Sequence, residues 1–102
     1  MKIIAMILTY NNHDMVDQAL EKIPKELFDT IFVSDDCSID KTPEVYMQKG
    51  IKVFRNKHNR GYGGNVKNAL ESAILNYEFD YIVEIHGDGA QFDPSATYDA
   101  RK

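Results

Sequence analysis

Two adjacent carboxylates, Asp35 and Asp36, follow the apolar run at residues 31–33, with only Ser34 between. Two neighbouring carboxylates are costly to bury together, so at least one is expected to meet water or a ligand. One interpretation is a solvated turn in which Asp40 or Thr42 caps the next helix. The other is a binding loop in which Asp35 or Asp36 accepts hydrogen bonds from a ribose or a base N–H. These residues alone leave both interpretations open.

A second candidate is the segment NRGYGGN, where Gly61, Gly63 and Gly64 precede an expected helix. Glycine permits close backbone approach, and the start of a helix offers free N–H groups and a positive dipole end to a phosphate. Arg60 adds a charge that could meet the same phosphate. The spacing matches neither the dinucleotide-binding pattern nor a P-loop, so a tight turn before a helix is the commoner interpretation.

The third candidate is EIHGDGAQFDP, residues 84–94, in which His86, Asp88 and Asp93 follow an apolar run. Carboxylate oxygens suit Mg²⁺ or Mn²⁺, the ions that accompany diphosphates, and His86 suits Mn²⁺ better than Mg²⁺. The paired Cys and His spacing of a zinc site is missing. The alternative is an Asp-Gly turn, with Asp93 and Pro94 beginning a helix.

Apolar runs and helical periodicity alternate along the chain. Strands are expected at 3–8, 29–36, 51–56 and 80–86, and helices at 13–23, 42–49 and from about 65 to 77. This alternation predicts βαβ units, and hence an α/β fold with a three-layer α/β/α, Rossmann-like arrangement and a mainly parallel sheet. Ligands bind such sheets at the carboxyl ends of the strands. The three polar segments, together with TYNN at residues 9–12, are therefore expected to meet at one edge.

Composition excludes several classes of function. The net charge is −4, and the sequence has no basic stripe, which argues against a nucleic-acid partner. Cys37 is the only cysteine, so no internal disulfide is expected and a reducing compartment fits. No apolar stretch approaches a membrane span, and the run at 3–8 is predicted to be a strand rather than part of a signal peptide. The length fits one domain, residues 1–102.

Four motifs in this order resemble glycosyltransferase family 2: TYNN, VSDDCSIDKT, NRGYGGNVKNAL and HGDGAQFDP. The resemblance extends to about Pro94 and is strongest to the dolichol- or polyprenyl-phosphate sugar transferases. It implies the nucleotide-binding half of a GT-A fold, with a UDP- or GDP-sugar as donor and Mg²⁺ or Mn²⁺ as cofactor.

The resemblance also implies a nucleotide-sugar site. The residues implied are Thr9, Tyr10, Asn12, Asp35, Asp36, Ser38, Gly61, Gly63, Gly64, Asn65 and Asp88. Asp35 is expected to contact the base, while Asp36 and Ser38 shape their loop. Asp88 matches the last aspartate of the family's D-x-D motif and is expected to bind the metal, with His86 where the first aspartate often stands. Asn12 stands where the family often has glutamate.

In this family the acceptor half, with its general base, follows the D-x-D segment. The chain is therefore expected to hold only the donor half, followed by a short and weakly apolar helix and a frayed tail. Asp99 is the one acidic candidate for a base there. Missing strands would leave an exposed sheet edge, which predicts a homo-oligomer. The family resemblance further implies an acceptor at a membrane and a cytoplasmic location, at the cytoplasmic face of that membrane.

Other classes are weighed against this interpretation. A nucleotidyltransferase needs a basic glycine-rich loop after the first strand, and TYNNHD has no Gly, Lys or Arg. A redox dinucleotide binder needs glycine in the same turn. A catalytically inactive α/β module that binds nucleotides or other proteins stays open, and it predicts no metal-dependent nucleotide binding.

Overall fold

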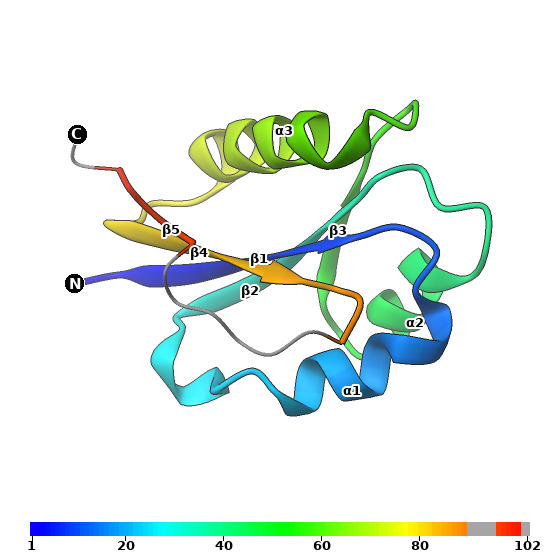
Figure 1. Ribbon diagram of the computed structural model, residues 1–102. Coiled ribbons are helices and arrows are strands. Elements are labelled where there is room, and N and C mark those ends of the chain that lie inside the picture. The colour runs from blue at the N-terminus through cyan, green and yellow to red at the C-terminus, as the bar shows by residue number, and fades with distance from the viewer. Residues whose placement is uncertain (90–95, 101–102) are drawn as a thin grey trace.

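The computed structural model describes residues 1–89 and 96–100 of the chain. Within these residues, five strands form one sheet in the order β3-β2-β1-β4-β5 (Figure 1). The strands are β1 (Ile3–Thr9), β2 (Thr30–Asp35), β3 (Lys52–Arg55), β4 (Tyr81–His86) and β5 (Thr97–Asp99). The first four are parallel, and β5 runs antiparallel to β4. The predicted α/β class with a mainly parallel sheet is confirmed.

Helices cover both faces of the sheet. Figure 1 shows α1 (Val16–Glu21) and α2 (Thr42–Gln48) on one face and α3 (Gly61–Asn76) on the other. Alternate residues of β1 supply two cores, because successive side chains of a strand point to opposite faces. Ala5 and Ile7 pack in the core that holds residues of α1 and α2. Met6 packs in the core that holds Ala69 and Ala73 of α3. The first strand is therefore buried on both faces, as its continuous apolar run predicts.

Two helices begin or end at residues other than those predicted. The helix expected at 13–23 is divided into a 3₁₀ turn, η1 (His13–Met15), and α1, and a second 3₁₀ turn, η2 (Lys25–Leu27), leads to β2. The helix expected from about Asn65 begins at Gly61 instead, so the glycines lie in its first turn and not in a loop before it. The side chain that holds this helix start comes from β2 and is described below.

The residues after the fourth strand depart most from the prediction. Residues 97–99 form a strand and not a frayed tail, pairing Thr97 with Val83 and Asp99 with Tyr81. Thr97 and Tyr98 are of the β-branched and aromatic types that suit a strand, and Ala96 accepts a hydrogen bond from the N–H of Glu84. The helix expected to begin at Asp93 and Pro94 lies outside the described residues.

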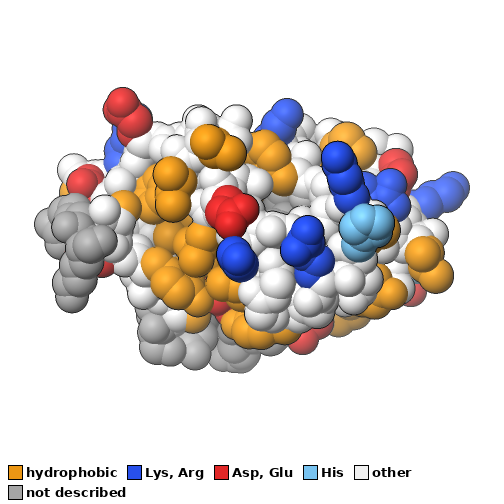
Figure 2. Space-filling view, turned by 90° about the horizontal axis from the view of Figure 1, so that it is seen from above, with side chains coloured by type: hydrophobic (Ala, Val, Ile, Leu, Met, Phe, Trp, Pro, Cys, Tyr) orange, Lys and Arg blue, Asp and Glu red, His pale blue; other side chains and the backbone are white. Residues whose placement is uncertain are grey.

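The surface above α3 is divided by side-chain type. Figure 2 shows apolar side chains gathered toward one end of this surface and basic side chains toward the other. The exposed apolar residues include Ile74 and Leu75 near the end of α3, and exposed Lys57 and Arg60 precede its start. Among the described residues, no helix is long and apolar enough to cross a membrane.

Candidate functional site

A cavity of about 370 Å³ lies where β1, β2 and β4 end and α3 begins. This volume is within the usual range for small-molecule sites. Most of the predicted nucleotide-sugar and metal residues line it: Thr9, Tyr10, Asn12, Asp36, Gly61, Asn65, His86 and Asp88. Three further lining residues were not predicted: Leu8, Asn59 and Tyr62. The parallel sheet thus brings four separate segments of the sequence to one edge.

Asp36 joins the end of β2 to the start of α3. Its Oδ1 accepts hydrogen bonds from the Arg60 N–H at 2.8 Å and the Asn56 side chain at 2.9 Å, and its Oδ2 accepts one from the Gly61 N–H at 2.9 Å. A carboxylate at a helix start satisfies free N–H groups and interacts favourably with the dipole. This long-range contact explains why α3 begins at Gly61, whose φ of +74° suits glycine. A carboxylate has about four acceptor positions, and these three donors leave one for a ligand in the cavity.

Asn65 continues this buried network. Its Oδ1 accepts hydrogen bonds from the Ser34 hydroxyl at 2.7 Å and from Asn56 Nδ2 at 3.0 Å, and its Nδ2 donates to the Ser34 carbonyl at 3.1 Å. Ser34, Asn56 and Asn65 are all buried. A fully hydrogen-bonded polar network fixes the first turn of α3 against the strand ends.

The turn after β1 is held by side chains on both sides. The Thr9 hydroxyl donates to Asn12 Oδ1 at 2.9 Å, and the Tyr10 N–H donates to the same oxygen at 3.0 Å. The Asn12 N–H donates to the Thr42 hydroxyl at 2.8 Å. Asn12 therefore orders the turn that carries Thr9 and Tyr10 to the cavity.

Asp35 and Ser38 do not line the cavity. Asp35 is 0% exposed, and its carboxylate accepts hydrogen bonds from the Ser38 N–H at 2.9 Å and the Ser38 hydroxyl at 2.5 Å. Arg55 Nε lies 3.7 Å from the same carboxylate. The two adjacent aspartates thus lie in different environments. Asp35 is hydrogen-bonded within its own turn, and Asp36 reaches the cavity.

Gly63 and Gly64 also lie outside the lining of the cavity. A Cβ on Gly64 would lie 2.6 Å from Arg60 Cβ, whereas one on Gly63 would meet nothing within 4 Å. Arg60 itself lines a separate groove between β3 and α3. Of the three glycines, only Gly61 contributes to the cavity, and Gly64 is needed for packing within the helix start.

The turn after β4 places His86 and Asp88 beside β1. A Cβ on Gly87 would lie 2.8 Å from Thr9 Cβ and 2.9 Å from the Leu8 carbonyl oxygen. The Gly87 N–H donates to that carbonyl at 2.8 Å. Only glycine permits this close approach, so the His-Gly-Asp sequence has a packing reason as well as a chemical one.

Two residues beside His86, Tyr62 and Glu84, were not predicted from the sequence. The Tyr62 ring stacks on the His86 ring, with centroids 5.6 Å apart and planes 7° apart. Glu84 Oε2 lies 3.4 Å from His86 Nε2 and accepts a hydrogen bond from the Tyr62 hydroxyl. The acidic residue at 84, within an otherwise apolar strand, was the available sign of this cluster.

The side chains present fit a divalent metal that arrives with a diphosphate. Among the described residues, no group of three or more His, Cys, Asp or Glu could hold a metal alone. Asp88 and His86 offer one carboxylate and one imidazole at the same cavity. Mg²⁺ is commonly bound by one or two carboxylates plus substrate phosphates, so this incomplete donor set is consistent with such a site.

A charged pair supports the loop behind the cavity. His13 Nδ1 lies 2.7 Å from Asp40 Oδ2, and this contact raises the pKa of His13 above its usual 6.5. Burial raises the pKa of Asp40, but hydrogen bonds from Thr42 and His13 outweigh burial and hold this pKa at about 2. Asp40 also accepts a hydrogen bond from the Thr42 N–H at 2.8 Å, so it satisfies the first N–H of α2, although the capping position itself is Lys41 and not Asp40 or Thr42 as predicted.

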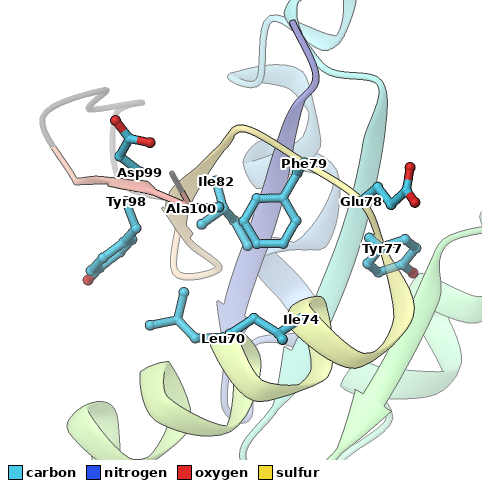
Figure 3. Close-up of a pocket in the computed structure, with 9 residues that line it drawn as sticks. All are labelled: Leu70, Ile74, Tyr77, Glu78, Phe79, Ile82, Tyr98, Asp99 and Ala100. Atoms are coloured by element: carbon cyan, nitrogen blue, oxygen red, sulfur yellow. The ribbon is translucent and has the colours of Figure 1, made fainter. Parts of the chain in front are cut away.

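A second and larger hollow, of about 540 Å³, lies between α3 and β5 (Figure 3). Its lining is mainly apolar and includes Leu70, Ile74, Phe79 and Tyr98. Asp99 lies here, paired with Tyr81 at the opposite end of β4 from His86. The suggestion that Asp99 is a base for a reaction in the cavity is therefore wrong, because the sheet carries it away from that edge.

Comparison with known proteins places the chain in a family. The family model described as glycosyl transferase family 2 matches residues 4–94. This chain belongs to glycosyl transferase family 2. The uncharacterized protein MJ1222 of Methanocaldococcus jannaschii is 33% identical over 88 residues, which are 86% of this chain and 36% of that protein.

Solved structures of glycosyltransferases share the fold. Glucosyl-3-phosphoglycerate synthase from Mycobacterium tuberculosis, in complex with Mn²⁺, UDP and glucosyl-3-phosphoglycerate, has a TM-score of 0.73 at 19% identity, over 88% of this chain and 35% of that one. S. aureus TarS has a TM-score of 0.66 at 28% identity, over 86% of this chain and 17% of that one. The mannosyltransferase PcManGT from Pyrobaculum calidifontis, in complex with GDP-Man and Mn²⁺, has a TM-score of 0.67 at 19% identity, over 85% of this chain and 27% of that one.

These comparisons confirm the predicted family and GT-A fold. They also show what fraction of a longer family 2 protein corresponds to this chain. The chain spans about a third of the length of MJ1222 and of the synthase. Its match falls in the N-terminal part of the glycosyltransferase structures.

Proposed function

We propose that the cavity at the carboxyl ends of β1, β2 and β4 is the donor site of a family 2 glycosyltransferase. It binds a nucleotide-diphospho-sugar, a UDP- or GDP-hexose, together with Mg²⁺ or Mn²⁺. The observation that carries this proposal is the convergence of four family motifs on one cavity of suitable size. The glycosyltransferase structures with the same fold are bound to UDP or GDP-Man and to Mn²⁺, which supports the choice of ligand.

Different residues of the cavity are proposed to contact different parts of the ligand. Thr9 and Tyr10 line the nucleotide part, and Asp36 offers its remaining acceptor position to a ribose hydroxyl or a base N–H. The contact predicted between Asp35 and the base requires the turn between Asp35 and Ser38 to open, since Asp35 is fully buried and does not line the cavity. Asp36 reaches the ligand without such a change.

The diphosphate is proposed to lie beside His86, Asp88 and Gly61. Asp88 and Asp36 are both acidic, and alone they would repel a diphosphate. A divalent ion held by Asp88 removes that repulsion and, when bound, stabilises the charge that develops on the leaving nucleotide. The exposed Lys57 and Arg60 near the start of α3 add a favourable long-range potential for an anion.

Transfer itself requires an acceptor held in line and a base. The described residues at the cavity provide donor-binding groups. We propose that the base and the groups that hold the acceptor belong to polypeptide corresponding to the rest of the longer relatives. We also propose that the protein is cytoplasmic and that its acceptor lies at the cytoplasmic face of a membrane. Residues 1–102 are proposed to form one domain, which associates with a second copy through a sheet edge.

Isothermal titration tests the donor site. The chain is titrated with UDP, GDP, UDP-glucose and GDP-mannose, with and without Mn²⁺, beside Asp88→Ala. Glu71→Ala, which removes an exposed carboxylate on α3 outside the cavity, is the matched control. The expected result is metal-dependent binding that Asp88→Ala loses and Glu71→Ala retains.

The titration also distinguishes a UDP-sugar site from a GDP-sugar site, and a donor site from an inactive module. A preference for UDP or GDP identifies the base of the donor. Absence of binding at millimolar ligand, with the chain folded, contradicts a donor site in this chain and favours the alternative of an inactive α/β module.

A further inference from the structure

A carboxylate is buried where an apolar residue would be expected. Glu84 is 2% exposed and pairs in register with Met6 in the middle of the sheet. Two residues before it in β4, Ile82 packs in the core beneath α3. A buried charge is costly unless other groups compensate it, and replacing it with a hydrophobic residue is often neutral or stabilising. The position therefore calls for a reason other than core packing.

Three side chains from three elements meet this carboxylate. The Tyr62 hydroxyl, from the first turn of α3, donates to Oε2, and the Tyr98 hydroxyl, from β5, donates to Oε1 at 2.8 Å. His86 Nε2 lies 3.4 Å from Oε2. Burial and the nearby Glu84 carboxylate raise the pKa of Tyr98, so its hydroxyl stays protonated and available as a donor.

The same cluster holds the His86 ring from two directions. Glu84 meets the Nε2 edge of the ring, and Tyr62 stacks on its face. Tyr62 and His86 both line the cavity, whereas Glu84 is sealed behind them. Since Nε2 faces the carboxylate, Nδ1 is the ring nitrogen left for a ligand.

We propose that Glu84 is a positioning residue of the donor site, which orients the His86 imidazole so that Nδ1 serves the metal and diphosphate. This inference rests on the proposed function of the cavity. Carboxylates that accept the second N–H of a histidine fix both its tautomer and its orientation, and their loss commonly reduces metal affinity 10- to 100-fold. Glu84 acts through His86 and does not touch the ligand.

Two variants separate positioning from a structural role. Glu84→Gln keeps the size of the side chain and an acceptor for tyrosine, but it removes the charge that faces Nε2. Tyr98→Phe removes one hydrogen bond to the same carboxylate and leaves the side that faces His86 intact. A merely structural carboxylate predicts similar effects from both variants.

Nitrogen-15 NMR of the imidazole provides a readout in the ligand-free chain. We expect the wild-type His86 ring to be protonated at Nε2 and not at Nδ1, and we expect the ring shifts to change in Glu84→Gln but not in Tyr98→Phe. A wild-type ring protonated mainly at Nδ1 would overturn the proposal without any variant, so the test survives if Glu84→Gln fails to fold.

Titration with UDP and Mn²⁺ provides the second readout. Glu84→Gln is expected to weaken the Mn²⁺-dependent binding of UDP about tenfold or more, with metal-free UDP binding unchanged and Tyr98→Phe within about twofold of wild type. Equal losses in both variants, or unchanged affinity in a folded Glu84→Gln, would reject positioning. If wild type binds no Mn²⁺ and UDP, the donor site fails, while the NMR result still decides whether Glu84 orients His86.

Discussion

Two of the hollows formed by the described residues lie toward opposite ends of β4 and differ in chemistry more than in size. The hollow between α3 and β5 is the larger, at about 540 Å³, and is lined mainly by apolar side chains (Figure 3). The cavity at the strand ends measures about 370 Å³ and brings together amides, hydroxyls, two carboxylates and an imidazole. Volume alone would not select this cavity, because the apolar hollow and two further grooves, of about 650 and 620 Å³, are all larger.

Polar organisation distinguishes the cavity. Asp36, Asn65 and Asn56 are buried and hydrogen-bonded to one another and to groups of β2 and α3, so their positions are fixed before any ligand arrives. In the hollow between α3 and β5, Ile74 is 70% exposed and makes no comparable network. A recognition site for a polar nucleotide needs the first kind of surface, and the comparison predicts different responses to substitution in the two regions.

The largest effect is expected from Asp36→Ala. The change leaves the Arg60 and Gly61 N–H groups and the Asn56 amide without their shared acceptor. We expect a loss of about 2–3 kcal/mol in the free energy of unfolding, because hydrogen bonds to a charged cap are lost in a buried setting. Urea denaturation followed by circular dichroism measures this loss. A change below about 0.5 kcal/mol would show that the strand-end network is not a stabilising scaffold.

Gly87→Ala tests the close approach of β1 and the turn after β4. The new Cβ would lie within 2.9 Å of Thr9 Cβ and the Leu8 carbonyl, and backbone atoms cannot yield easily. We expect destabilisation of about 1–3 kcal/mol together with weaker metal-dependent nucleotide binding, since the turn carries Asp88. Gly63→Ala, whose Cβ meets nothing within 4 Å, is the matched control and should cost nothing. Equal thermal stability of the two variants would argue against the packing account.

The strand-end region is also expected to respond to pH through Asp40 and His13. Asp40 has a pKa of about 2 in the folded chain against 3.8 as its ordinary value, so its contribution is present above pH 3.8 and is lost as the pH falls toward 2. His13 has a raised pKa, so its contribution is complete below pH 6.5 and is lost as the pH rises through the folded value. The pair therefore stabilises most between about pH 4 and 6.5.

The measurement for this pair is the midpoint of thermal unfolding from pH 2.5 to 8.5, compared with Asp40→Asn. The difference between wild type and variant should be greatest near pH 5 and should shrink toward both ends. A difference that is constant with pH would mean that the His13–Asp40 contact does not contribute through its charges.

The smallest effect is expected in the other region. Ile74, which lines the apolar hollow and is 70% exposed, should tolerate replacement by serine within about 0.5 kcal/mol, because little apolar area is lost from the core. Nucleotide binding should be unchanged, since α3 meets the cavity only at its other end. Denaturation and titration check both statements, and a loss of nucleotide binding in Ile74→Ser would contradict the distinction between the two regions.

Local sequence predicted the sheet, and it predicted that the polar segments meet at one edge. The apolar run at residues 3–8 and the polar segments that follow each strand are local signals, and parallel topology alone brings their ends together. The split between Asp35 and Asp36 was not predictable, because it depends on Ser38 closing one turn and on Arg60 and Gly61 arriving from 24 and 25 residues away.

The errors have the same origin in long-range contacts. The start of α3 was placed too late because its cap comes from β2, and residues 97–99 were not recognised as a strand because β4 supplies their partner. Glu84 was not predicted as a site residue, because the two tyrosines that meet it come from α3 and β5. Such contacts leave little trace in local periodicity.

The most direct test of the donor site uses Mn²⁺ as a paramagnetic probe. With UDP present, Mn²⁺ is added to the nitrogen-15-labelled chain, and broadening of the amide signals is measured residue by residue. The account predicts strong broadening around Asp88, His86 and Thr9, and little at Ile74 and Glu78 beside the apolar hollow. Broadening centred on the apolar hollow, or spread evenly over the exposed carboxylates, would contradict a donor site at the strand ends.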